Sequence, residues 1–278
     1  MKRIASVCVS FFVIVLFLSS PSTVRSEEKV IKLKYSNFFP PSHKNSILSE
    51  QWGKEIEKRT NGRVKVTYFP GNTLTPPTQT YDSVVKGIAD VGQSLMGYAP
   101  GRFPLTEVLA LPLGYSTGTQ ATNLTNEFYK KFKPKEFDDS QVMYFHGHGP
   151  GLFHTKKVIS SIDDIKGLRI KANAENAAIV TAVGGAPVSL PITETYDGLQ
   201  KGTLEAVEGS LATQDGYSFQ EVCKYLTTIN FGFGGMNIIF RKSVFDSMPS
   251  DVQKVVIEVA SEQPAFMERF VIFENAER

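Results

Sequence analysis

Three of the four histidines in the chain lie in one short segment, at His146, His148 and His154. His146 and His148 are two residues apart, so a strand would place both imidazoles on one face. With His154 and a carboxylate, they would supply the ligand types of a zinc site. The segment is rich in glycine, and the sequence points to no particular fourth ligand. Two interpretations therefore stay open: an exported metal-binding protein or hydrolase, and histidines that are hydrogen-bonded or exposed.

Motifs for covalent or phosphate chemistry are missing from the sequence. No Ser, Cys or Lys lies in a recognisable nucleophile motif. The segment VGGAP (183–187) follows a predicted helix instead of a strand, and it lacks the lysine of a phosphate-binding loop. The pair Asp163-Asp164 is explained by the preference of helix starts for carboxylates. We therefore expect no enzymatic activity, no bound metal and no cofactor.

A strand with a cationic face follows the histidine segment. Apolar and polar residues alternate there, as Leu168-Arg169-Ile170-Lys171-Ala172-Asn173. Because side chains two apart on a strand share a face, Arg169 and Lys171 are expected to point the same way. Either cation could bind an anion, and a solvated strand edge would have the same pattern.

Aromatic residues in loops are the second candidate feature. Phe38, Phe39, Tyr98 and Phe233 lie in segments rich in glycine or proline. Burial of such side chains is favourable, so they are candidates for the walls of a ligand site. Plugs of a hydrophobic core would look the same in the sequence.

Composition and the first residues limit the class of protein to which the chain can belong. The chain has 278 residues, 41% of them hydrophobic and 21% charged, which is ordinary for a globular protein. Residues 1–26 read as a signal peptide, with Lys2 and Arg3 before an apolar run too short to span a membrane comfortably. Cleavage is expected after Ser26, which predicts a periplasmic protein, and an uncleaved anchor is the alternative. Removing the leader's three basic residues would change the formal net charge from +2 to −1, which gives no reason to expect nucleic acid as a partner.

The elements that would position these residues alternate along the chain. Strands are expected near 30–35, 64–68 and 87–94, with helices at 44–60 and 78–87 between them. Further helices are expected at 123–132, 174–183 and 214–226, and a long final helix is expected from Ser250. This alternation predicts an α/β fold. A repeated motif, YDSVVKGIAD (81–90) and YDGLQKGTLE (196–205), suggests two lobes built from similar units with a cleft between them.

Several phrases together carry a family resemblance. They include HGPGLFHTKK, SIDDIKGLRIKAN, KVTYFPGNTL, GRFPLTEVLALP, VGGAPVSLP and ETYDGLQKGTLEAVEG. In this order they resemble the periplasmic solute-binding receptors of TRAP (tripartite, ATP-independent) transporters, the DctP-like family, over nearly all of the chain after the leader. The resemblance implies a two-lobed periplasmic-binding-protein fold, each lobe a mixed sheet flanked by helices, with the ligand cleft between the lobes. It places residues 27–148 plus 237–278 in lobe I and 149–236 in lobe II.

The resemblance also implies a ligand anchor. Receptors of this family clamp the ligand carboxylate with an arginine at the end of the cationic strand. Here Lys171 occupies that arginine position, and Arg169 occupies the position of the family's usual lysine. Some members use a second arginine where this chain has Gly151, and many use an asparagine where it has Gly209. We therefore expect Lys171 to be the anchor, with Arg169, Phe38, Phe39, Tyr98, Gly151, Gly209 and Phe233 also at the site. Loss of the two polar side chains favours a bulkier or more apolar solute.

The expected function is that of a receptor that binds a small organic acid and delivers it to a TRAP membrane permease. One alternative is a periplasmic receptor for an uncharged or aromatic solute that serves a sensor or another transporter. The other is the metal-binding protein of His146, His148 and His154. Receptors of the family continue beyond the run FMERFVIFENAER into further helix, so the resemblance implies a chain truncated at its C-terminus.

Overall fold

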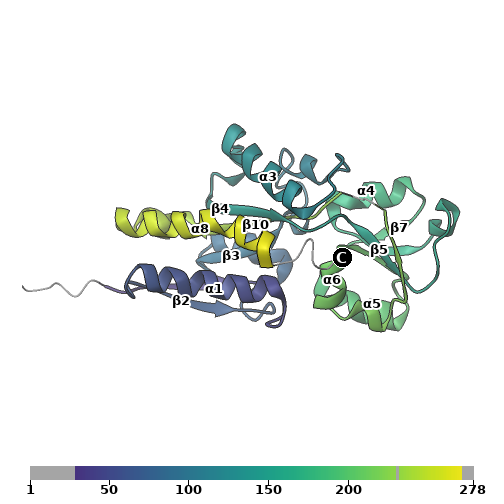
Figure 1. Cartoon of the computed structure of the whole chain (residues 1–278), viewed down its shortest axis with the longest axis horizontal. Coiled ribbons are helices and arrows are strands. Elements are labelled where there is room, and N and C mark those ends of the chain that lie inside the picture. The colour runs from purple at the N-terminus through teal and green to yellow at the C-terminus, as the bar shows by residue number, and fades with distance from the viewer. Residues whose placement is uncertain (1–28, 230–231, 271–278) are drawn as a thin grey trace, which may run out of the picture.

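Two lobes, each a five-stranded mixed sheet flanked by helices, make up the fold (Figure 1). The computed structural model describes residues 29–229 and 232–270, with side chains as far as residue 266. The expected signal peptide, residues 1–26, lies outside the described residues. The predicted α/β class and two-lobed architecture are confirmed. Within the described residues, no helix combines the length and the apolar character needed to cross a bilayer.

The sheet of lobe I has the strand order β2-β1-β3-β10-β4. Strand β1 runs parallel to β2 and β3, whereas β10 runs antiparallel to β3 and β4. A strand from late in the sequence therefore lies between two early ones. The bounds are β1 Ile31–Ser36, β2 Val64–Phe69, β3 Val91–Leu95, β4 Ser140–Gly147 and β10 Gly235–Arg241.

The sheet of lobe II has the strand order β7-β6-β8-β5-β9. Strand β6 runs parallel to β7 and β8, and β5 runs antiparallel to β8 and β9. The bounds are β5 Leu152–Thr155, β6 Arg169–Lys171, β7 Ala186–Val188, β8 Ala206–Gly209 and β9 Tyr225–Thr227. The exact lobe boundaries at 148/149 and 236/237 stay a prediction.

Eight α-helices lie in the described part of the chain, and most of the expected ones are present. Their bounds are α1 Lys44–Arg59, α2 Thr80–Val85, α3 Gly118–Phe132, α4 Ala174–Ala182, α5 Thr195–Lys201, α6 Leu211–Gly216, α7 Lys242–Asp246 and α8 Ser250–Phe270. Helix α3 begins earlier than expected because the Thr117 side chain caps it, accepting a hydrogen bond from the Gln120 backbone N–H.

The predicted helix at 214–226 is wrong. Helix α6 ends at Gly216, and Ser218 then adopts a left-handed backbone conformation with φ of 56°. A short 3₁₀ turn, Phe219–Glu221, leads into β9, which pairs with β5. Phe219 and Cys223 are buried in the core although no α-helix carries both. The Cys223 N–H donates to the Phe219 carbonyl at 2.7 Å, so a turn brings these two residues into the core.

Helices α1 and α8 lie side by side over the sheet of lobe I (Figure 1). Trp52 and Ile56 of α1 and Val252 and Val256 of α8 are buried in one core cluster with Tyr35. Trp52 and Ile56 are four residues apart and so share one face of α1, which is thus the face that packs.

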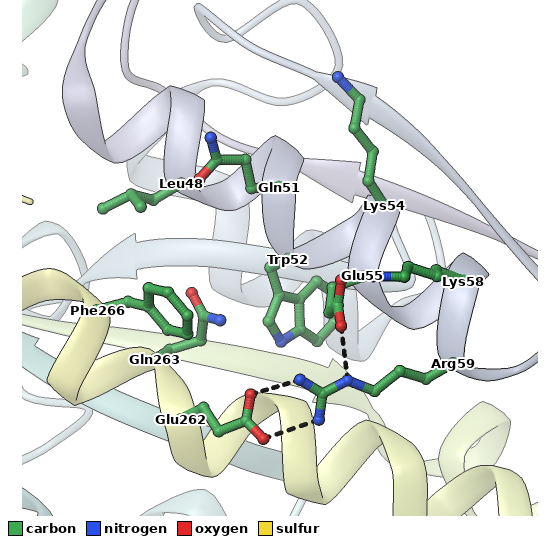
Figure 2. Close-up of a pocket in the computed structure, with 10 residues that line it drawn as sticks. All are labelled: Leu48, Gln51, Trp52, Lys54, Glu55, Lys58, Arg59, Glu262, Gln263 and Phe266. Atoms are coloured by element: carbon green, nitrogen blue, oxygen red, sulfur yellow. Dashed lines mark hydrogen bonds and ion pairs between the residues drawn. The ribbon is translucent and has the colours of Figure 1, made fainter.

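An ion pair joins the same two helices at their exposed edge (Figure 2). Both terminal nitrogens of Arg59 lie 2.7 Å from the carboxylate oxygens of Glu262, and its Nε lies 2.7 Å from Glu55. The open groove around this pair is lined by α1 and α8 alone and shares no residue with the cavity between the lobes.

Two crossover segments connect the lobes, one after β4 and one before β10. They are bonded to each other at two points. The Gly151 N–H donates to the Gly232 carbonyl at 2.9 Å, and the Gly234 N–H donates to His148 Nε2 at 2.7 Å. Glycine permits this close approach of two backbones.

Candidate functional site

A small cavity lies between the two lobes. Lobe I and the crossover segments contribute Phe38, Phe39, Leu95, Tyr98, His148 and Met236 to its lining, and lobe II contributes Lys171, Asn173, Ile192, Glu208, Gly209, Thr213 and Tyr217. Its volume is about 50 Å³. Pockets for small molecules typically have roughly 300–1,000 Å³. The lobes are therefore closed on each other, and the space left between them is smaller than such a pocket.

Lys171 is the cation of this cavity. It ends β6, its exposed fraction is only 2%, and its Nζ donates to Asn173 Oδ1 at 2.6 Å. Burial lowers the pKa of Lys171, and the nearby carboxyl groups of Glu208 and Glu175 partly offset that effect. An ammonium has three donors, and a buried one needs acceptors for each. Lys171 is thus placed to donate to an anion in the cleft.

Glu208 faces the same cavity from the neighbouring strand β8. It is 1% exposed, and neither of its carboxylate oxygens has a hydrogen-bond partner among the described residues. The C-terminal ends of the parallel strands β6 and β8 carry Lys171 and Glu208, the edge at which ligands bind in open α/β sheets. Our sequence reasoning missed Glu208. Its place directly before Gly209, a residue already expected at the site, was the available signal.

The aromatic loops form one wall. The rings of Phe38 and Phe39 stack with centroids 4.4 Å apart, and Tyr98 meets Phe38 edge-on at 5.6 Å. The Tyr98 hydroxyl oxygen accepts a hydrogen bond of 3.0 Å from the backbone N–H of Ile192 in lobe II. These three side chains belong to a core cluster that spans both lobes. They therefore line the cavity and also pack in the hydrophobic core.

Three expected site residues lie outside the cavity lining. Arg169 is exposed at the start of β6, where it pairs with Glu205 at 3.4 Å and donates to the Gly202 carbonyl at 2.8 Å. Phe233 is buried against Tyr115 in a separate cluster. Gly151 lies in the crossover, whereas Gly209 does line the cavity.

The histidines are hydrogen-bonded in different places. The Gln93 side-chain nitrogen lies 2.7 Å from His146 Nε2, and His148 Nε2 accepts from Gly234. His154 lies near the Gly209 carbonyl, at 3.3 Å. Burial lowers the pKa of His146 to about 3 and also lowers the pKa of the other two. Within residues 29–229 and 232–270, no three metal-ligating side chains gather into a metal site.

A second contact between the lobes involves Glu175, near the start of α4. A Cβ added to Gly97 of lobe I would lie 1.3 Å from Glu175 Oε2, so the glycine leaves room for this carboxyl group. Neither carboxyl oxygen has a hydrogen-bond partner in the described part of the chain. Burial raises the pKa of Glu175 to about 7.

Known proteins resemble this chain in sequence and fold. Residues 35–277 match the family described as bacterial extracellular solute-binding protein, family 7 (DctP). A TRAP periplasmic solute-binding protein from Desulfovibrio salexigens is 34% identical, with a TM-score of 0.73 over 86% of this chain and 75% of that one. That structure is an open complex in which the C-terminus of a symmetry mate occupies the ligand-binding site.

Two further relatives have named ligands. A TRAP receptor from Bordetella bronchiseptica, solved with bound (R)- and (S)-mandelate, is 27% identical with a TM-score of 0.78 over 84% of this chain and 76% of that one. The C4-dicarboxylate-binding periplasmic protein DctP of Rhodobacter capsulatus is 23% identical over 257 residues, 91% of this chain and 76% of that protein. With the two-lobed fold and the closed cavity, these matches give the identity: the chain belongs to family 7 of the bacterial extracellular solute-binding proteins, the receptors of TRAP transporters.

Proposed function

We propose that this protein binds a small organic acid between its lobes in the periplasm and delivers it to a TRAP membrane permease. The observation that carries the proposal is the burial of Lys171 at the end of β6, inside the cleft. Mandelate and C4-dicarboxylates, the ligands of two relatives, are small carboxylates.

Lys171 supplies the charge for the carboxylate. Its present acceptor, Asn173 Oδ1, is neutral, so a carboxylate would form the stronger, charge-assisted hydrogen bond. A lysine binds as a point charge and lacks the two-pronged geometry of arginine. Shape selection then falls to the wall of Phe38, Phe39 and Tyr98.

Opening and closing follow from the interlobe contacts. The cavity is too small for a drug-sized solute while Tyr98 is bonded to Ile192 and Glu175 lies against Gly97. Separation of the lobes about the crossovers would admit the solute, and closure would bury it. The closed, occupied form is the one that we propose the permease recognises.

Calorimetry on residues 27–278 tests the assignment. The probes are (R)-mandelate, succinate and benzoate, with mandelamide as the uncharged counterpart of mandelate. We expect at least one acid to bind and the amide not to bind.

Lys171→Met should weaken binding of that acid by about ten- to a hundred-fold, the range for a hydrogen bond to a charged group. Arg169→Met, on the same strand but outside the cavity, is the matched control and should bind as wild type. Unchanged affinity in Lys171→Met would refute the anchor.

Export and delivery are tested separately. We place the leader at residues 1–26, so mature protein from the periplasm should begin at Glu27 on N-terminal sequencing. Uptake of the bound acid into cells that express a TRAP permease should require addition of the receptor. Uptake without it would contradict the delivery role.

A further inference from the structure

Glu208 is a buried carboxyl group without a hydrogen-bond partner among the described residues. Only 1% of its surface is exposed, and both oxygens lack a hydrogen-bond partner among the described residues. A buried carboxylate without donors is costly, and native proteins rarely keep one without a functional reason. Glu208 lines the interlobe cavity, so the donor that it lacks can come from a solute.

The other polar groups that line the cavity do not donate a hydrogen bond to Glu208. Lys171 Nζ donates to Asn173, and the hydroxyl of Thr213 is bonded to Ser210 at 3.1 Å. His148 Nε2 accepts from Gly234, and its Nδ1 lies 2.6 Å from the Gly149 carbonyl. The Tyr217 hydroxyl, also in the lining, has no described partner and is free to donate to a solute.

The cavity therefore holds one cation and one carboxyl group that do not bond to each other. A plain monocarboxylate at Lys171 would leave Glu208 without a donor and would bring a second negative charge beside it. A solute with both an ammonium and a carboxylate would match both groups at once. The aromatic wall adds to this, because ring faces attract cations.

We propose that the solute is a zwitterion, an amino acid or a similar small amino-carboxylate, whose carboxylate binds Lys171 and whose ammonium binds Glu208. This inference rests on the proposed function and specifies the solute class of the same site.

Two matched series of acids test the inference by calorimetry. Propionate, lactate and alanine differ only in bearing H, OH or NH₃⁺ on one carbon, and phenylacetate, mandelate and phenylglycine repeat the comparison on an aromatic frame. In at least one series, the amino acid should bind about ten- to a hundred-fold more tightly than its plain acid, with the hydroxy acid between them.

Glu208→Gln should abolish this preference, because an amide has lost the negative charge that attracts the ammonium. Glu205→Gln is the matched control: it lies directly before the same strand, but its carboxylate pairs with Arg169 at the surface. The control should retain the preference of the wild type.

The outcomes distinguish a failure of the proposed function from a failure of the zwitterion inference. Absence of binding by all six acids, and by succinate and benzoate as well, would contradict the proposed function. Plain acids that bind as tightly as their amino counterparts would overturn the zwitterion inference and leave the receptor role intact. The inference would also fail if Glu208→Gln kept the full preference for the ammonium group.

Discussion

The hydroxyl oxygen of Tyr98 in lobe I accepts a 3.0 Å hydrogen bond from the backbone N–H of Ile192 in lobe II. The bond joins the two lobes, and both residues line the cavity between them. The wall of the site is thus also part of the contact that holds the two lobes together.

Tyr98→Phe keeps the ring and removes this bond. An ordinary hydrogen bond contributes about 0.5–1.5 kcal/mol, so ligand affinity should fall roughly two- to tenfold. Titration calorimetry with the best-binding acid measures this directly. Tyr81→Phe is the control, because the hydroxyl of Tyr81 bonds to Asp139 and Ser140 within lobe I. An equal loss in both variants would show that the effect is not one of closure.

Gly97→Ala should disfavour the closed arrangement, because the carboxyl group of Glu175 must move to make room for the new methyl. The new methyl would lie 1.3 Å from Glu175 Oε2, well inside contact distance. We expect a larger radius of gyration in solution scattering and weaker ligand binding. Glu175→Ala in the same chain removes the clashing group and should restore closure. A double variant as open as Gly97→Ala alone would place the obstruction elsewhere.

Closure should also depend on pH through Glu175. Its pKa is raised from 4.5 to about 7 by burial, so the closed form holds a proton that the open form releases between these values. Raising the pH from 5 to 8 should therefore favour opening, by at most about 3 kcal/mol by linkage. Scattering at the two pH values measures the shift, and Glu175→Gln should remove it. Equal pH dependence in wild type and variant would argue against the assignment.

Overall stability should have the opposite pH dependence through His146. Burial lowers its pKa from 6.5 to about 3, so the unfolded chain binds a proton below pH 6.5 that the folded chain does not. The free energy of unfolding is therefore highest above about pH 6.5, and it declines as the pH falls below that value. Between pH 7 and pH 5 this residue should cost about 2 kcal/mol of unfolding free energy. Urea denaturation at both pH values measures it, and His146→Gln should reduce the loss by that amount. A variant that loses as much stability as wild type would exclude His146 as the source.

Much of the fold could be predicted because its signals are local. The face of α1 with Trp52 and Ile56 is buried as its spacing indicated. The turn after Gly216 was missed because the left-handed conformation of Ser218 gives no signal in the sequence. Periodicity reports which residues are buried together, and a turn can bury two residues as well as a helix can.

The site was only partly predictable for a different reason. Alternation on β6 gives Arg169 and Lys171 one face, but it does not say which end of the strand lies in the cleft. The structure exposes Arg169 at the start of β6 and buries Lys171 at its end, in the cavity between the lobes. The sequence gives the place of Glu208 beside Gly209, but its burial without hydrogen bonds depends on residues distant in sequence.

The position of β10 has a consequence for how the protein is assembled. This strand lies between β3 and β4, so β4 reaches the rest of its sheet only through residues 235–241. A chain that emerges N-terminus first therefore exposes an unpaired edge on both β3 and β4 until all of lobe II has been made. Lobe II, whose five strands are consecutive, can form earlier. We expect it to fold first, and its completed body then holds the two halves of lobe I close enough for the last strand to join them.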